Sequence, residues 1–157
     1  MNRVLVAGVG NIFFGDDGFG SEVARRLLAE PPAAGVHVED FGIRGLHLAY
    51  ELLAGYDYAI LIDAVGRGAA PGTLFVIEPD VMAPGVTPDA HGMQLENVFA
   101  LMRTLGDPPP AIQLVGCEPE STDEGIGLRP SVARAVDAAL PLIRQLIERK
   151  VSVWSAV

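Results

Sequence analysis

Short apolar segments alternate with amphipathic segments along this 157-residue chain, and the alternation constrains its fold more than any other feature. The apolar segments are typical of strands and the amphipathic segments of helices, because their hydrophobic residues repeat at the matching periods. The predicted strands cover residues 3–8, 36–42, 58–64, 72–79 and 111–119, and the predicted helices cover 17–30, 46–55, 93–105 and 131–149. This order predicts an α/β fold, a three-layer sandwich in which helices cover both faces of a mostly parallel, twisted sheet of about five strands.

The totals limit what the chain can be. Its length fits one domain, so we expect a single domain over residues 1–157. Cys117 is the only cysteine, which excludes an internal disulfide and suits the cytoplasm. No apolar run is long enough to cross a bilayer, and the opening residues fit a first strand better than a signal peptide.

The net charge of −9 argues against nucleic acid or an anionic membrane as a partner. It suits a basic protein surface or a cation. We expect a monomer that does not insert into a membrane.

The stretch GVGNIFFGDDGFG (8–20) joins the first predicted strand to the first helix, where open α/β sheets bind ligands. A dinucleotide fingerprint would need a third glycine where Phe13 stands. The two acids Asp16 and Asp17 would also repel a pyrophosphate, although Asp40 follows the second strand as a ribose ligand would. A P-loop is excluded because no G-K-[ST] follows the glycines.

Nucleophilic catalysis has little support, because no G-x-S-x-G sequence is present. The thiol of Cys117 ends an apolar strand, which is more typical of a core residue than of a nucleophile. Nothing in the sequence supports a pairing of Cys117 with His91. We expect surface or boundary positions for His37 and His47.

A metal site is the third possibility for the opening stretch. Asp17 follows the first strand, Asp63 ends the third, and His91 lies in the loop after the fourth. We expect all three at the same edge of the sheet. Two carboxylates and one imidazole suit a divalent cation such as zinc, nickel, iron or manganese, and they leave positions open for water or a substrate.

Each of these residues also has a purely structural reading. We expect Asp16 to cap the first helix, and Asp17 could simply sit in its first turn, where the helix dipole favours an acid. Asp63 could accept hydrogen bonds in a turn, and His91 could simply precede a helix. The coincidence of three potential metal ligands at one edge favours the metal site.

The opening stretch resembles the N-terminal signature of the nickel–iron hydrogenase maturation proteases, and the resemblance continues to about residue 149. The later matching segments follow in the family's order: DFGIRGLHLAYELL (40–53), LIDAV (61–65), PGTLFVIEP (71–79), HGMQL (91–95), LVGCEPE (114–120) and GIGLRPSV (125–132). The resemblance implies a single peptidase domain with a phosphorylase/hydrolase-like α/β sandwich fold.

The resemblance also implies an activity. Members of this family are endopeptidases that remove a short C-terminal extension from the large-subunit precursor of a nickel–iron hydrogenase after nickel has been inserted. Their nickel-sensing ligands correspond here to Asp17, Asp63 and His91. The implied nickel comes with the substrate rather than being held permanently.

One segment departs from the family pattern. The family's Asp-Gly-Gly-Thr-x-Gly is DFGIRG here, so Phe41 and Ile43 replace a glycine and a threonine. Related enzymes recognise their substrate with this loop, so the type of hydrogenase served stays open. Arg44 could contact substrate carboxylates or could be solvated.

For the chemistry, a carboxylate that binds no metal, such as Asp16 or Asp40, is a candidate proton acceptor beside the ligands. Two other functions remain open from the sequence. One is a chaperone that binds the metal-loaded subunit without cutting it. The other is an amidohydrolase for small molecules, which would hold a resident metal.

Overall fold

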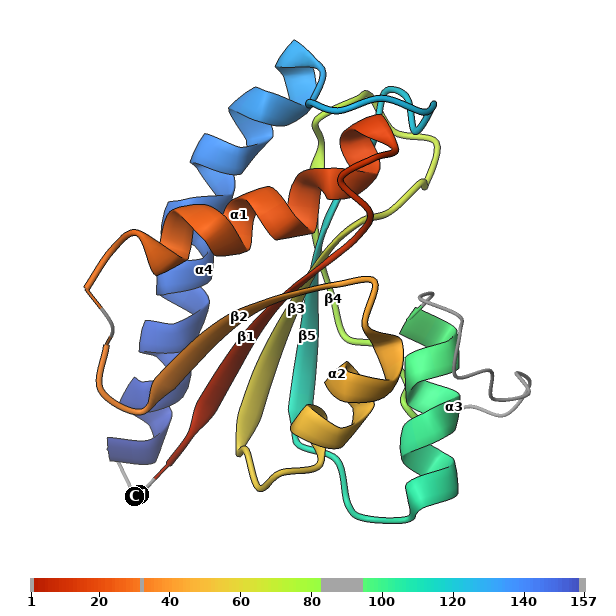
Figure 1. The fold of residues 1–157 in the computed structure, drawn as a ribbon. Coiled ribbons are helices and arrows are strands. Elements are labelled where there is room, and N and C mark those ends of the chain that lie inside the picture. The colour runs from red at the N-terminus through yellow and green to blue at the C-terminus, as the bar shows by residue number, and fades with distance from the viewer. Residues whose placement is uncertain (1, 32, 83–94, 156–157) are drawn as a thin grey trace.

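The computed structural model describes residues 2–31, 33–82 and 95–155. Figure 1 shows strands and helices alternating along most of the chain, as the sequence predicts. The elements are β1 (Val4–Val9), a 3-10 helix η1 (Gly15–Gly18), α1 (Phe19–Leu28), β2 (Val36–Gly42), α2 (Gly45–Leu52), β3 (Tyr58–Ala64), β4 (Leu74–Ile77), α3 (Leu95–Leu105), β5 (Ala111–Cys117) and α4 (Pro130–Ser155).

Within the described residues the strands form one five-stranded sheet in the order β2-β1-β3-β5-β4. The pairs β1–β2, β1–β3 and β3–β5 are all parallel, which confirms the mostly parallel sheet. β3 lies in the centre, and its first five residues are buried. A strand covered on both faces must be apolar throughout, which explains the sequence YAILI.

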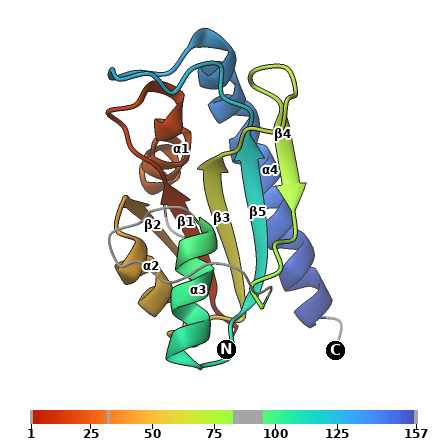
Figure 2. The same cartoon turned by 90° about the vertical axis from the view of Figure 1, so that its right-hand side faces the viewer.

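β4 differs from its expected direction. It pairs with β5 in the antiparallel sense, with Leu74 opposite Cys117 and Ile77 opposite Leu114, and Figure 2 shows its arrow opposed to that of β5. The carboxyl end of β4 therefore points away from the edge where β1, β3 and β5 end. The expectation that the loop after this strand begins at that edge is wrong. His91, in that loop, lies outside the described residues.

The sheet divides the core into two layers, and alternate residues of each strand enter opposite layers. Leu5 and Ala7 pack with α2 and α3, whereas Val4 and Val6 pack with α1 and α4. Figure 1 shows these two helix pairs on the two faces of the sheet. The three-layer sandwich predicted from the sequence is confirmed.

The structure shifts several predicted boundaries. The helix expected over 17–30 is a 3-10 turn followed by α1, and α4 extends to Ser155 with Pro141 inside it. A side chain at Gly20 would overlap the carbonyl oxygens of Val9 and Ile62, so a glycine lets α1 lie close against the sheet. Among the described residues, no helix is long and apolar enough to cross a membrane.

Candidate active site

A pocket of about 810 Å³ opens at the edge where β1 and β3 end. Asp17 reaches it from the loop after β1, and Asp63 from the end of β3 itself. Ile43 from the loop after β2 and Glu96 from the first turn of α3 line the same pocket. The fold thus brings the two aspartates of the predicted metal site into one pocket.

The backbone of the β1 loop orients Asp17. Its Oδ2 accepts a hydrogen bond of 2.8 Å from the backbone N–H of Asn11, so the loop folds back on its own carboxylate. Gly10 has a positive φ of 138°, and a side chain there would overlap the Asp17 carbonyl oxygen. This tight turn is the reason for a glycine at position 10.

Asp63 has the most perturbed carboxyl group of the site. Burial in the pocket wall and, next, the nearby negative charge of Asp17 raise its pKa to about 8. Glu96 acts in the same direction, while a backbone hydrogen bond from Ala64 opposes the rise. Two acids in one poorly solvated pocket favour a bound proton or a bound cation between them.

The described residues contain no group of three metal-binding side chains, so Asp17 and Asp63 form an incomplete site there. His91, the third predicted ligand, is outside this part of the chain. It precedes Leu95 by four residues in the sequence, and Leu95 lines the pocket. A metal ion held by Asp17 and Asp63 would need its other ligands from residues beyond the described ones or from a substrate.

Asp16 has a different task from its neighbour. Its side chain is fully buried, and its two oxygens accept backbone hydrogen bonds from Glu120 (2.8 Å), Ser121 (3.0 Å) and Arg129 (2.7 Å). We call this arrangement the Asp16 clasp. The expected helix cap is wrong, because Phe14 occupies the N-cap position of η1 without a side-chain bond. With its acceptors engaged, Asp16 fastens two loops together.

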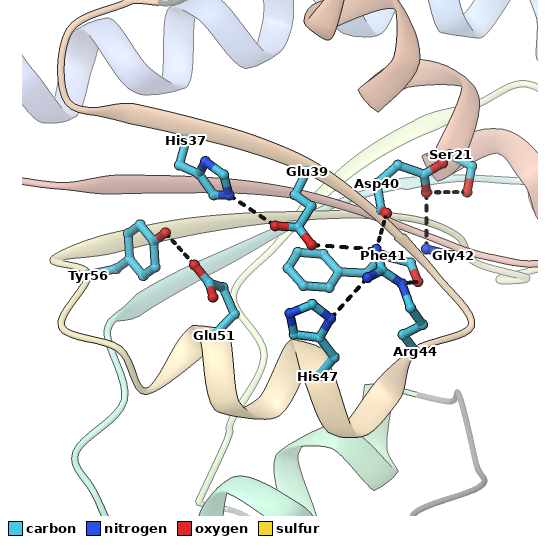
Figure 3. Close-up of polar contacts among 10 residues, drawn as sticks. All are labelled: Ser21, His37, Glu39, Asp40, Phe41, Gly42, Arg44, His47, Glu51 and Tyr56. Carbon is cyan, nitrogen blue, oxygen red and sulfur yellow. Dashed lines mark hydrogen bonds and ion pairs between the residues drawn. The ribbon is translucent and has the colours of Figure 1, made fainter.

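Asp40 lies outside the pocket. Its Oδ1 accepts hydrogen bonds from the hydroxyl of Ser21 (2.7 Å) and the backbone N–H of Gly42 (3.0 Å), as Figure 3 shows. It lines a neighbouring groove of about 270 Å³ beside Ile12. The structure therefore brings Asp17 and Asp63 together, and it places Asp40 in the neighbouring groove, where its hydrogen bonds hold the β2–α2 loop.

Arg44 is bound to its own loop. Figure 3 shows its guanidinium donating to the backbone carbonyls of Asp40 (2.6 Å) and Phe41 (3.1 Å) and contacting His47 Nδ1 at 2.9 Å. It also pairs with Glu39 at 3.4 Å. Phe41, the departure from the family pattern, is buried with the His47 ring against its edge. These contacts fix the loop's shape.

His37 and His47 have the surface positions that the sequence predicts. Both are exposed, and His37 Nε2 lies 3.0 Å from Glu39 Oε1 (Figure 3). The structure also confirms that Cys117 is a core residue. Burial raises the pKa of its thiol to about 11, so a nucleophilic thiolate is scarce at neutral pH.

Sequence reasoning missed three residues of this edge. Glu96 and Arg67 line the pocket, and the Arg67 guanidinium lies 5.2 Å from the centre of the Phe75 ring. Glu118 is buried, and its Oε1 accepts backbone hydrogen bonds from Arg67 (2.7 Å) and Ala69 (2.9 Å). An acid in the first helical turn directly after a loop was the available signal for Glu96.

The amino-acid sequence of this chain is similar to those of several known proteins. The model of the hydrogenase maturation protease family matches residues 21–146, a span that includes Asp63 and begins after Asp17. The hydrogenase expression/formation protein HupD of Rhodobacter capsulatus is 36% identical over 144 residues, which are 88% of this chain and 68% of that protein. The hydrogenase 2 maturation protease of Escherichia coli K12 is 33% identical, covering 88% of this chain and 86% of its own length.

The fold agrees with these relatives. The structure of the hydrogenase maturating endopeptidase HybD from E. coli matches 94% of this chain and 93% of its own, with a TM-score of 0.79 and 29% identity. A family match over most of the chain, relatives above 30% identity and a shared fold point in one direction. The chain belongs to the hydrogenase maturation proteases, and it is a maturation endopeptidase.

Proposed function

We propose that this endopeptidase removes the C-terminal extension of a nickel–iron hydrogenase large-subunit precursor after nickel insertion, and that it recognises the bound nickel. The observation that carries the proposal is the joint position of Asp17 and Asp63 in one pocket at the carboxyl ends of β1 and β3. The raised pKa of Asp63 supports it, because a cation would relieve the repulsion that favours its protonation.

In this proposal the nickel is part of the substrate and arrives with it. Asp17 and Asp63 supply oxygen ligands and His91 supplies a nitrogen ligand, a donor set that suits a divalent first-row metal. A bound metal polarises a carbonyl group and lowers the pKa of a coordinated water. Docking of the nickel on these three residues places the scissile peptide at the mouth of the pocket.

The geometry narrows the choice of the residue that accepts a proton from the attacking water. Asp16 is engaged by three backbone N–H groups, and Asp40 lies in the neighbouring groove. Glu96 lines the pocket with Asp17 and Asp63, and it is exposed there. We therefore propose Glu96 as the base ahead of Asp40, since a general base must reach the attacking water.

The direct test is intact-mass analysis of a large-subunit precursor incubated with this protein, with and without bound nickel. We expect loss of a C-terminal peptide only from the nickel-loaded precursor. A folded His91→Ala variant should leave that precursor uncut. Cleavage of both forms would remove nickel recognition from the proposal, and cleavage of neither would overturn it.

Metal analysis of the purified protein separates this proposal from the amidohydrolase alternative. A nickel ion that arrives with the substrate predicts less than about 0.1 metal ion per chain after purification, because Asp17 and Asp63 alone make an incomplete site. A stoichiometric metal that survives dialysis would instead indicate a resident catalytic ion.

A further inference from the structure

Large apolar side chains gather around the mouth of the pocket instead of inside the core. They are Ile12 (49% exposed), Phe13 (58%), Phe14 (43%), Ile43 (58%) and Ile126 (78%), which we call the apolar rim. They come from the loops after β1, β2 and β5. Exposed apolar residues scattered singly are normal, whereas a group of them around a functional pocket indicates an interaction surface.

Backbone hydrogen bonds join the three loops of the apolar rim to one another. Gly15 N–H donates to Gly125 O at 2.8 Å, and Gly125 N–H donates to Phe13 O at 2.8 Å. Gly10 N–H donates to Gly42 O at 3.0 Å, which ties the β2 loop to the β1 loop. Figures 1 and 2 both show the β1 and β5 loops together at the end of the sheet far from the chain termini.

The Asp16 clasp adds a second fastening beneath the apolar rim. Its carboxylate binds residues 120, 121 and 129, which bracket Ile126, and Phe13 and Phe14 lie three and two residues before Asp16 in the chain. The rim side chains are therefore exposed on a fixed backbone. A surface that is ordered before binding loses little entropy when a partner docks.

The apolar rim is continuous with the candidate active site. Phe14 and Ile43 line the same pocket as Asp17 and Asp63. Ile12 and Ile126 line the adjoining groove of about 270 Å³. A macromolecule that places a peptide over the two aspartates must therefore also cover these side chains.

Charge indicates which kind of macromolecule covers the rim. Asp123 and Glu124 are exposed three and two residues before Ile126, and the chain as a whole carries a net charge of −9. A second copy of this chain would bring like charges together at the contact, which is unfavourable. A surface with apolar residues at its centre and basic residues at its border fits better.

We propose that the apolar rim is the docking surface for the folded body of the hydrogenase large-subunit precursor, whose contact patch is apolar with a basic border. This proposal rests on the proposed function and extends it. The rim binds the body of the substrate, while the pocket receives the segment that is cut. Recognition thus uses protein surface as well as the metal.

The test compares the double variant Phe13→Ser/Ile126→Ser with the wild-type protein on the nickel-loaded precursor. Neither residue lines the pocket, so kcat should stay within about twofold while KM and the precursor Kd rise roughly tenfold or more. The matched control is Leu28→Ser/Val153→Ser, because these side chains are 54% and 62% exposed on other parts of the surface. The control should leave both constants unchanged, and thermal unfolding should show that both double variants fold.

The outcomes separate this proposal from the proposed function. If the wild type cuts the precursor and the rim variant has an unchanged KM, the docking proposal is overturned and the function stands. If the wild type binds the precursor without cutting it and the rim variant does not bind, docking stands and the function fails. A wild-type protein that neither binds nor cuts overturns both.

Sedimentation of the same proteins tests whether a second copy of this chain binds the apolar rim instead. We expect the wild type and the rim variant both to sediment as monomers at tens of micromolar protein. A wild-type dimer that the rim substitutions dissociate would show that the rim joins two copies of this chain, and it would overturn the proposal.

Discussion

The Asp16 clasp and the pocket around Asp63 lie at the same edge of the sheet, and they treat a carboxylate in opposite ways. Asp16 is fully buried, and three backbone N–H groups replace the water that it has lost. Asp63 is desolvated next to the negative charges of Asp17 and Glu96, and its pKa rises to about 8. One carboxylate is surrounded by hydrogen-bond donors, and the other has two negatively charged neighbours.

This difference shows how the surroundings alone separate an acid that holds loops together from an acid with a raised pKa. A buried acid surrounded by donors holds loops together, because its hydrogen bonds replace hydration. A desolvated acid beside other acids costs folding free energy, and a protein retains that cost where a cation or proton is to be bound. The two roles belong to residues that the sequence presents in very similar terms.

Removing the Asp16 clasp should have the largest effect on stability. Asp16→Ala leaves three backbone N–H groups without their acceptor, and each costs about 1 kcal/mol or more, so unfolding should become easier by roughly 3 kcal/mol. Urea unfolding of the variant against wild type measures this loss. The exposed Asp123→Ala is the control and should change stability by less than about 0.5 kcal/mol. A loss below about 1 kcal/mol for Asp16→Ala would mean that water readily replaces the clasp.

Neutralising the other acid should affect activity instead. Asp63→Asn keeps the shape of the side chain and removes the charge, so processing of nickel-loaded precursor should fall roughly 100-fold or more. Single-turnover cleavage followed by intact mass gives the rate, and circular dichroism checks the fold. Full-rate cleavage by a folded Asp63→Asn protein would remove Asp63 from the site.

The pH dependence of stability should separate the same two regions. The carboxyl pKa of Asp63 is raised from 3.8 to about 8 on folding, so the folded state binds its proton more tightly than the unfolded state. Below about pH 4 the Asp63 carboxyl group therefore does not lower the free energy of unfolding. As the pH rises from 4 toward 8, this free energy falls by up to about 1.4 kcal/mol per pH unit. In the presence of a metal chelator, the free energy of unfolding of Asp63→Asn should exceed that of the wild type by at least about 1 kcal/mol between pH 5 and pH 7.5. If the free energies of unfolding of the two proteins change with pH in parallel, the buried environment assigned to Asp63 is wrong.

The smallest expected effect concerns Glu118. Like Asp16 it is a buried acid that accepts backbone hydrogen bonds, but its donors belong to the loop that lines the pocket. Glu118→Gln keeps an oxygen acceptor and loses the charge, so the bonds from Arg67 and Ala69 should weaken by about 1 kcal/mol. Amide exchange should become faster at those two N–H groups, with little change elsewhere. The exposed Glu120→Gln is the control. Unchanged exchange at both amides would show that the 66–69 loop is held by other contacts.

Most of the architecture could be predicted, because hydrophobic periodicity reports burial directly. The fully apolar run YAILI predicts the central strand, and the structure places β3 in the centre of the sheet. The direction of β4 could not be predicted. Its four residues, Leu74–Ile77, pair with the edge of β5 that faces away from β3. The hydrophobic pattern of a strand has the same period whichever way the strand runs.

The site was predictable only in part, for a related reason. The ends of parallel strands meet at one edge, so the joint position of Asp17 and Asp63 follows from topology. The role of Asp16 depends on partners more than 100 residues away, which no local pattern records. Glu96 likewise enters the pocket from the first turn of α3, and no local sequence pattern shows that this turn lies beside the two aspartates.

The sequence distance spanned by the Asp16 clasp has a consequence for how the enzyme comes into being. The bonds from Glu120 and Arg129 close loops of 104 and 113 residues, and such long-range contacts form late because closing a long loop costs chain entropy. On the ribosome, the β1 strand and its aspartates emerge long before their fastening partners. The segment that carries Asp16 and Asp17 is therefore fastened to the loop after β5 only when most of the chain has been made.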